Sequence, residues 1–175
     1  MSSAAATLLD HAPEEVARLS TKERASFLHH GQELLRAVSW EGARDFDLTT
    51  AMTATIAAHA ALMAAGFPES EDPFRDVTTV VVHPRTIVDR ALRQGPTSGV
   101  VTADPRHLPG SAGPGRGPIL LDWATIQRDL PHPERGTNVI FHEFAHKFDQ
   151  LDGVMDGVPL LPDKAARAEW EQTIG

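Results

Sequence analysis

Residues 137–151 read TNVIFHEFAHKFDQL and predict one amphipathic helix. At about 100° per residue, most of the apolar side chains fall on one side of this helix. They are Ile140, Phe141, Phe144, Ala145, Phe148 and Leu151. The opposite side carries His142, Glu143, His146, Asp149 and Gln150. Because only Val139 breaks the pattern, we expect one face to pack in the core and the other to be available for chemistry.

The spacing His142-Glu-x-x-His146 is typical of zinc metalloproteases. Two histidines four residues apart lie one turn apart on the same helix face, so both imidazoles can reach one metal ion. Zinc lowers the pKa of a bound water to about 7, and the Glu143 carboxylate is placed to accept its proton. A solvated face that carries these residues without metal is the alternative interpretation.

The sequence before this helix predicts three further helices and two strands. Ser20 and Glu23 form a capping-box pattern ahead of a helix over residues 21–38. A second helix is predicted over residues 50–65, with Met52, Ile56, Ala60 and Met63 as its buried stripe. The β-rich runs 77–82 and 119–121 predict strands, and Asp122 is a candidate cap for a short helix over residues 123–129.

The order of these elements favours an α+β fold rather than a regular alternation of strands and helices. Residues 1–18 are expected to form a flexible N-terminus, and residues 19–175 a single domain. Residues 104–118 contain four prolines and four glycines, which predicts an irregular surface loop.

Composition excludes several classes of function. The chain has 175 residues and no cysteine, so cysteine nucleophiles, disulfides and zinc–cysteine modules are ruled out. Its net charge of -8 argues against broad nucleic-acid binding. No secretory signal and no membrane span is recognisable, so the sequence indicates a cytoplasmic protein.

The segment HEFAHKFDQLDGVMDGVPLLP, residues 142–162, resembles the active-site segment of the zinc metallopeptidases of the Mlc titration factor A family. The similarity extends to GPILLDW at 117–123 and VTTVVVHPRTIV at 77–88. The resemblance implies a zincin-like fold of the gluzincin type, in which a small mixed sheet lies over the active-site helix. It also implies that His142 and His146 bind Zn²⁺ and that Glu143 is the catalytic base.

The third zinc ligand of this family is a glutamate on a later helix. We find no counterpart of it up to Gly175, and we therefore expect a chain that is truncated relative to the family. The candidates within the chain are Asp149, Asp152, Glu169 and Glu171. Asp152 follows His146 by six residues, an offset at which metzincins place a ligand, whereas Asp149 is better placed to accept a hydrogen bond near the metal.

The resemblance implies a cytoplasmic, aminopeptidase-like hydrolase that acts on a peptide or protein substrate. We expect an edge strand near Ile119–Leu121 to pair with extended substrate. The alternative is a regulatory protein of another class, which binds and sequesters a transcriptional repressor without turnover. Neither nucleic acid nor a membrane is expected as a partner.

Overall fold

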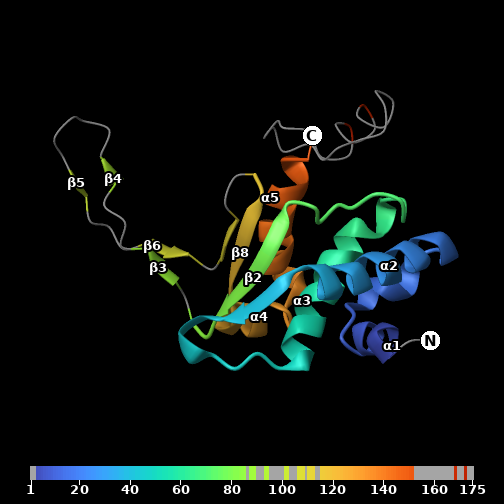
Figure 1. Ribbon diagram of the computed structural model, residues 1–175, viewed down its shortest axis with the longest axis horizontal. Coiled ribbons are helices and arrows are strands. Elements are labelled where there is room, and N and C mark those ends of the chain that lie inside the picture. The colour runs from blue at the N-terminus through green and yellow to red at the C-terminus, as the bar shows by residue number, and fades with distance from the viewer. Residues whose placement is uncertain are drawn as a thin grey trace.

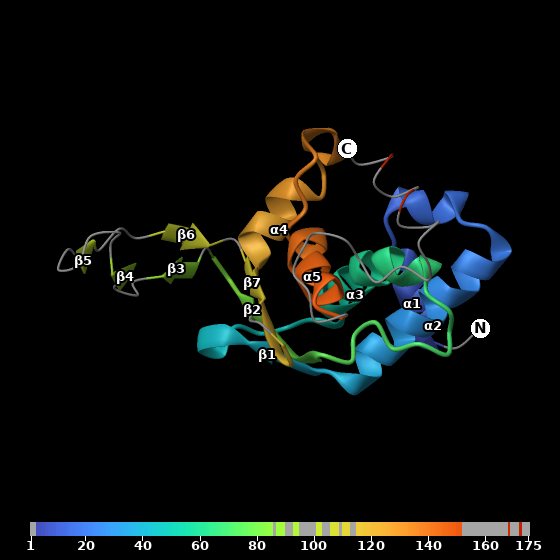
Figure 2. The same ribbon diagram turned by 90° about the horizontal axis from the view of Figure 1, so that it is seen from above.

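The computed structural model describes residues 3–85, 87–89, 93–94, 101–102, 106–108, 110–112 and 115–151, together with 168 and 172. Within this part, a small mixed sheet is covered on one side by helices, as Figure 1 shows. Figure 2, viewed from above, places helix α5 beside the sheet, then α3, with α1 and α2 beyond. The structure is therefore a layered mixture of helices and strands.

The sheet has the strand order β1-β2-β8-β7. Strands β1 (Ser39–Gly42), β2 (Val77–His83) and β8 (Gly117–Asp122) are parallel, and β7 (Gly110–Ala112) runs antiparallel to β8. Two separate pairs join β3 (Ile87–Asp89) to β6 (Arg106–Leu108) and β4 (Arg93–Gln94) to β5 (Val101–Thr102). They lie to one side of the sheet in both views.

Two expectations about this region are wrong. Residues 119–121 belong to β8, which is an inner strand between β2 and β7, so the edge strand at this end of the sheet is β7. Residues 104–118 are not an irregular loop throughout, because β6, β7 and the start of β8 fall within them. Gly115 has a φ of 65° between β7 and β8, a left-handed conformation that glycine adopts at little cost.

The described part of the chain contains five α-helices. They are α1 (Ser3–Asp10), α2 (Thr21–Ala37), α3 (Thr50–Met63), α4 (Trp123–Asp129) and α5 (Val139–Asp149). Short 3₁₀ turns η1 (Glu14–Arg18), η2 (Ala43–Asp45), η3 (Ala64–Gly66) and η4 (Pro133–Arg135) connect them. Residues 3–18 belong to the segment expected to be flexible, yet they contribute to the core, since Leu8 of α1 and Val16 of η1 are both buried.

The predicted helix starts are confirmed by their caps. The Ser20 hydroxyl accepts from the Glu23 backbone N–H, and the Glu23 carboxylate accepts from the Ser20 N–H. At α4, the buried Asp122 carboxylate accepts from the Thr125 N–H. Each of these bonds satisfies a backbone donor that the helix itself leaves without a partner.

Helix α3 is buried over most of its circumference and not along one stripe. Ala54, Ile56, Ala57, Ala58, His59, Ala60 and Ala61 are all buried, whereas Met52 and Met63 are only half-buried. The alanines allow α2 and α5 to approach α3 closely because they add little volume beyond the backbone. The predicted helix is therefore confirmed; its predicted buried stripe is right for Ile56 and Ala60 and wrong for Met52 and Met63.

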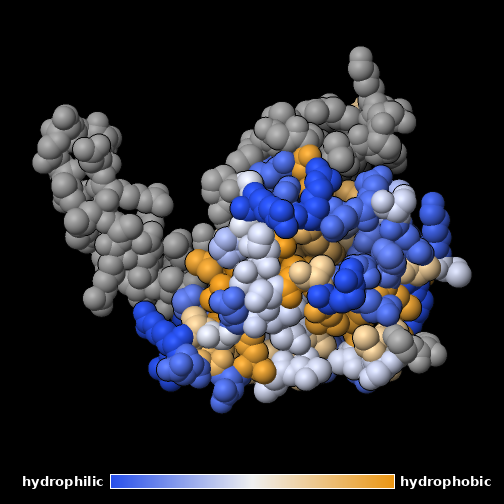
Figure 3. All heavy atoms as spheres, viewed as in Figure 1, coloured by the Kyte–Doolittle hydropathy of each residue, from blue (hydrophilic) through white to orange (hydrophobic). Residues whose placement is uncertain are grey.

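The hydrophobic core lies between the sheet and the helices. Val80 and Val82 of β2 and Ile119 and Leu121 of β8 pack into the same cluster as Phe144 of α5. On the face seen in Figure 3, hydrophilic residues are interspersed with apolar ones. Among the described residues, no helix combines the length and the apolar character needed to cross a lipid bilayer.

Candidate metal centre on helix α5

Helix α5 is fixed at its start by Asn138. The Asn138 side-chain oxygen accepts from the backbone N–H groups of Ile140 and Phe141, at 3.0 and 3.3 Å. Two of the four donors left without a partner at this helix end are thereby satisfied. This cap sets where the helix begins, and hence where His142 and His146 project.

The imidazoles of His142 and His146 converge as the four-residue spacing predicts. Their Nε2 atoms are 3.2 Å apart, and their rings are 4.6 Å apart between centroids at an interplanar angle of 80°. Two nitrogens bound to one tetrahedral zinc at ~2.0–2.1 Å lie roughly 3.3 Å from each other. The two side chains therefore present their nitrogens at the separation that a shared zinc ion requires.

Glu143 lies in a different environment from the two histidines. Its side chain is 3% exposed, whereas His142 is exposed and His146 is half-buried. Burial raises the pKa of Glu143 to about 7, although a hydrogen bond from the Ala112 backbone N–H acts in the opposite direction. Glu143 is thus held against the edge strand β7.

The helix has two buried flanks, so the predicted division into two faces is only partly right. Val139, Glu143 and Lys147 are buried along one line, with the Lys147 side chain fully inaccessible. Phe141 is half-buried and Ala145 is exposed, although both were assigned to the core. The remaining apolar positions, Ile140, Phe144, Phe148 and Leu151, are buried as predicted.

Lys147 of α5 and Gln150, the C-cap residue of this helix, both bind Gly115 between β7 and β8. Lys147 donates from Nζ to the Gly115 carbonyl at 2.7 Å, and the Gln150 side-chain oxygen accepts from the Gly115 N–H. Both backbone groups of Gly115 are therefore bonded to side chains at the C-terminal end of the helix that carries the histidines. This arrangement fixes the edge strand β7 beside Glu143.

We predict that Lys147→Met lowers the free energy of unfolding by about 1–3 kcal/mol, because the Gly115 carbonyl loses its charged donor. Urea denaturation followed by circular dichroism measures this loss. Lys22→Met is the matched control, since Lys22 is exposed on α2. Equal stability changes in the two variants would show that the contact with Gly115 contributes nothing.

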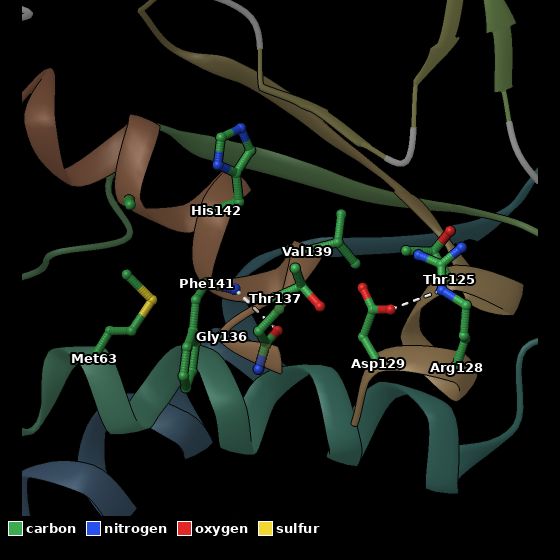
Figure 4. A pocket seen from close by; sticks show the side chains of 11 residues that line it. Met63, Thr125, Arg128, Asp129, Gly136, Thr137, Val139, Phe141 and His142 are labelled. Carbon is green, nitrogen blue, oxygen red and sulfur yellow. Dashed lines mark hydrogen bonds and ion pairs between the residues drawn. The ribbon is translucent and has the colours of Figure 1, made fainter. Parts of the chain in front are cut away.

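A cavity of about 650 Å³ adjoins His142. Phe141 and Ala145 of α5 line it together with Met63 of α3 and Arg128 of α4. Figure 4 shows His142 above this cavity and the ion pair between Arg128 and Asp129 at one end, with Nε and Oδ1 at 2.8 Å. We call it the His142 cavity; it offers space for a ligand directly beside His142.

The described part of the structure places no third metal ligand beside His142 and His146. Asp149 is half-buried at the end of α5. Asp152, Glu169 and Glu171 lie outside the residues that the structure describes. Within the described part of the chain, no group of three or more metal-ligating side chains is assembled.

The family model described as glucose-regulated metallo-peptidase M90 matches residues 1–175, the whole chain. The chain belongs to this M90 family. Membership indicates a metallopeptidase-like protein, and metallopeptidases use a bound metal ion. The resemblance that the active-site segment suggested is thereby confirmed.

Relatives of this M90 chain are found in cyanobacteria and in enterobacteria. An uncharacterized protein of Synechocystis sp. is 33% identical over 155 residues, which cover 89% of this chain and 55% of that protein. Mlc titration factor A of Escherichia fergusonii is 42% identical over 60 residues, 34% of this chain and 22% of the relative. The protein of the same name from Pectobacterium atrosepticum is 43% identical over 58 residues, 33% of this chain and 21% of the relative. The chain spans about half the length of the Synechocystis protein that it matches.

Three features of this M90 site were missed by the sequence analysis. They are the hydrogen bond from the Ala112 N–H to the Glu143 carboxylate, the two hydrogen bonds to Gly115, and the cavity beside His142. The first two features join residues that are distant in the sequence: Gly115 is 32 positions from Lys147 and 35 from Gln150. Hydrophobic periodicity could not indicate these features, because it does not reveal that polar residues of α5 are buried.

Proposed function

We propose that the chain is the metal-binding part of a zinc-dependent peptidase, with His142 and His146 as two of the zinc ligands. The observation that carries this proposal is the 3.2 Å separation of their Nε2 atoms on α5. Neutral imidazole nitrogen is a common ligand of zinc, and three protein ligands are usual at a catalytic site. We propose that the third ligand comes from outside the described residues.

When bound, zinc polarises a substrate carbonyl and lowers the pKa of water at the metal. Glu143 directly follows His142, and we propose that its carboxylate accepts the proton of the attacking water and later passes it to the leaving amine. The hydrogen bond from the Ala112 N–H keeps this carboxylate in one position. Burial around Glu143 excludes bulk water from the proton transfer.

We propose that an extended peptide substrate pairs with β7, the edge strand next to α5. This strand carries Ala112, whose N–H is bonded to Glu143, so a peptide along β7 would pass close to the proposed base. Such pairing uses backbone hydrogen bonds and therefore tolerates many substrate sequences. A helix carrying HExxH beneath an edge strand is the arrangement that the zincin-like fold implies.

Metal dependence of hydrolysis tests this function. A mixture of unrelated peptides is incubated with the protein, and cleavage is followed by mass spectrometry. We expect cleavage that stops when zinc is chelated and returns when zinc is added back. Absence of cleavage by the zinc-loaded protein, combined with tight binding of a transcriptional repressor, would instead favour the regulatory alternative suggested by the name Mlc titration factor.

A further inference from the structure

A second cavity, of about 470 Å³, adjoins the His142 cavity and is lined by residues of a different character. His59 of α3 and Glu14 and Glu15 of η1 contribute its polar side chains on one side. The two cavities share Asp129, Gly136, Thr137, Asn138 and Phe141. We call this second space the His59 cavity.

The hydrogen bonding of His59 fixes which ring nitrogen carries the proton. Its Nδ1 lies 2.9 Å from the Thr55 carbonyl oxygen, which can only accept, so Nδ1 is the donor. Burial lowers the pKa of His59 below its ordinary value, which keeps the ring neutral at neutral pH. Nε2 is therefore left as an acceptor, and no described residue donates a hydrogen bond to it. His59 is 8% exposed and lines the cavity, so a donor group of an occupant can bind this lone pair in place of water.

Three carboxylates, those of Glu14, Glu15 and Asp129, also line the His59 cavity and can accept hydrogen bonds. Only one of them has an ion-pair partner among the described residues. Asp129 is paired with Arg128. Glu14 and Glu15 have no hydrogen-bond or ion-pair partner among the described residues, and Glu15 is close enough to His59 to influence its titration. None of the described residues that line this cavity is a lysine or an arginine. The cavity therefore combines at least three acceptors with an unbalanced negative charge.

We propose that the His59 cavity binds the cationic side chain of an arginine or lysine in the peptide that the His142 site cleaves. A guanidinium group has five N–H donors and no acceptor, which complements one imidazole nitrogen and two carboxylates. This inference rests on the proposed function for its link to cleavage. The binding of the cation itself does not depend on hydrolysis.

Phe141 connects this cavity to the histidine pair. Its ring lines both cavities and lies 5.9 Å from the His59 ring between centroids. It also directly precedes His142 on α5. A peptide whose basic side chain occupies the His59 cavity is therefore held on the segment that leads into the proposed metal ligands.

Binding of a small cation tests the site without any hydrolysis. The protein carrying Glu143→Gln is titrated with n-butylguanidinium and with the neutral isostere n-butylurea, while the imidazole resonances of His59 are followed by NMR. We expect saturable chemical-shift changes with n-butylguanidinium. We expect n-butylurea to bind at least about 10-fold more weakly. Glu15→Gln should weaken guanidinium binding about 5-fold, since Glu15 supplies one of the two unpaired charges. Glu71→Gln removes an exposed carboxylate outside this cavity and should change nothing.

The link to cleavage is tested on the wild-type protein with N-acetylated peptides. A single arginine is moved along a neutral peptide, and a matched series carries citrulline at the same positions; acetylation removes the α-amino group as a competing cation. We expect one arginine position to lower KM about 5-fold relative to citrulline, with kcat little changed.

The outcomes separate this inference from the proposed function. Equal binding of the guanidinium and the urea overturns the cation site, even if peptides are cleaved. Guanidinium binding with equal cleavage of the arginine and citrulline series overturns the role in substrate selection. If the guanidinium binds and no peptide is cleaved, the peptidase function fails and the cation site stands.

Discussion

Glu143→Gln is expected to lower the turnover of peptide hydrolysis by about 10²-fold or more and to leave zinc binding intact. The substitution keeps the size of the side chain and one oxygen that can still accept from the Ala112 N–H. It removes the group that would take the proton from water. Turnover is measured at saturating peptide, and zinc content by elemental analysis of the same preparation.

The matched control for this substitution is Glu134→Gln, which alters an exposed glutamate of η4 that pairs with His132. It should leave turnover within about 2-fold of the wild type, because surface ion pairs contribute little. A Glu143→Gln protein with unchanged turnover would show that another group acts as the base. Loss of both zinc and activity would assign Glu143 a structural role.

Phe144→Ala is expected to lower the free energy of unfolding by about 3–5 kcal/mol, because it opens a cavity in a packed core. Phe144 is fully buried on α5, and its ring meets that of Phe74 edge-on, with the centroids 5.6 Å apart at 85°. Phe74 also contacts Phe148, so the loss affects a cluster of three rings. Urea denaturation followed by circular dichroism gives the change.

Phe141→Ala is the appropriate comparison, since Phe141 belongs to the same helix but is half-buried beside the two cavities. Its loss of stability should be clearly smaller than that of Phe144→Ala. Comparable losses would contradict the core and the cavity walls described above. A loss of less than about 1 kcal/mol in the free energy of unfolding of Phe144→Ala would also contradict the position of Phe144 in the core.

The sequence was most informative where structure is set locally. One capping box, the candidate cap Asp122 and the apolar repeats predicted α2, α4 and α5 within a few residues, because caps and helical periodicity act over one or two turns. The convergence of His142 and His146 follows from the same short-range geometry. For this reason the central pair of the candidate site was predictable.

The sequence was least informative where distant segments decide the environment. Glu143 was assigned to the face available for chemistry and Lys147 to neither face, but both are buried, Glu143 against β7 and Lys147 against Gly115. The strand Gly110–Ala112 has no β-rich pattern of its own; its pairing with β8 makes it a strand. Such contacts depend on tertiary context, which outweighs local propensity.

The third zinc ligand is also a feature that depends on contacts between distant segments of the chain. No fixed offset from His146 identifies it, because zinc ligands on different elements meet only through the fold. Asp152 was selected for its spacing alone, and it lies outside the described residues. The sequence therefore predicts two ligands from one helix and leaves the third as a proposal.

Zinc content is the most direct test of this account. The wild-type protein and a variant with both His142→Ala and His146→Ala are purified alike, equilibrated with zinc, dialysed and analysed for metal per chain, with circular dichroism as the check on folding. We predict about one zinc per wild-type chain and none above background in the variant. Equal zinc in two folded proteins, or none in either, would contradict the assignment of His142 and His146 as zinc ligands.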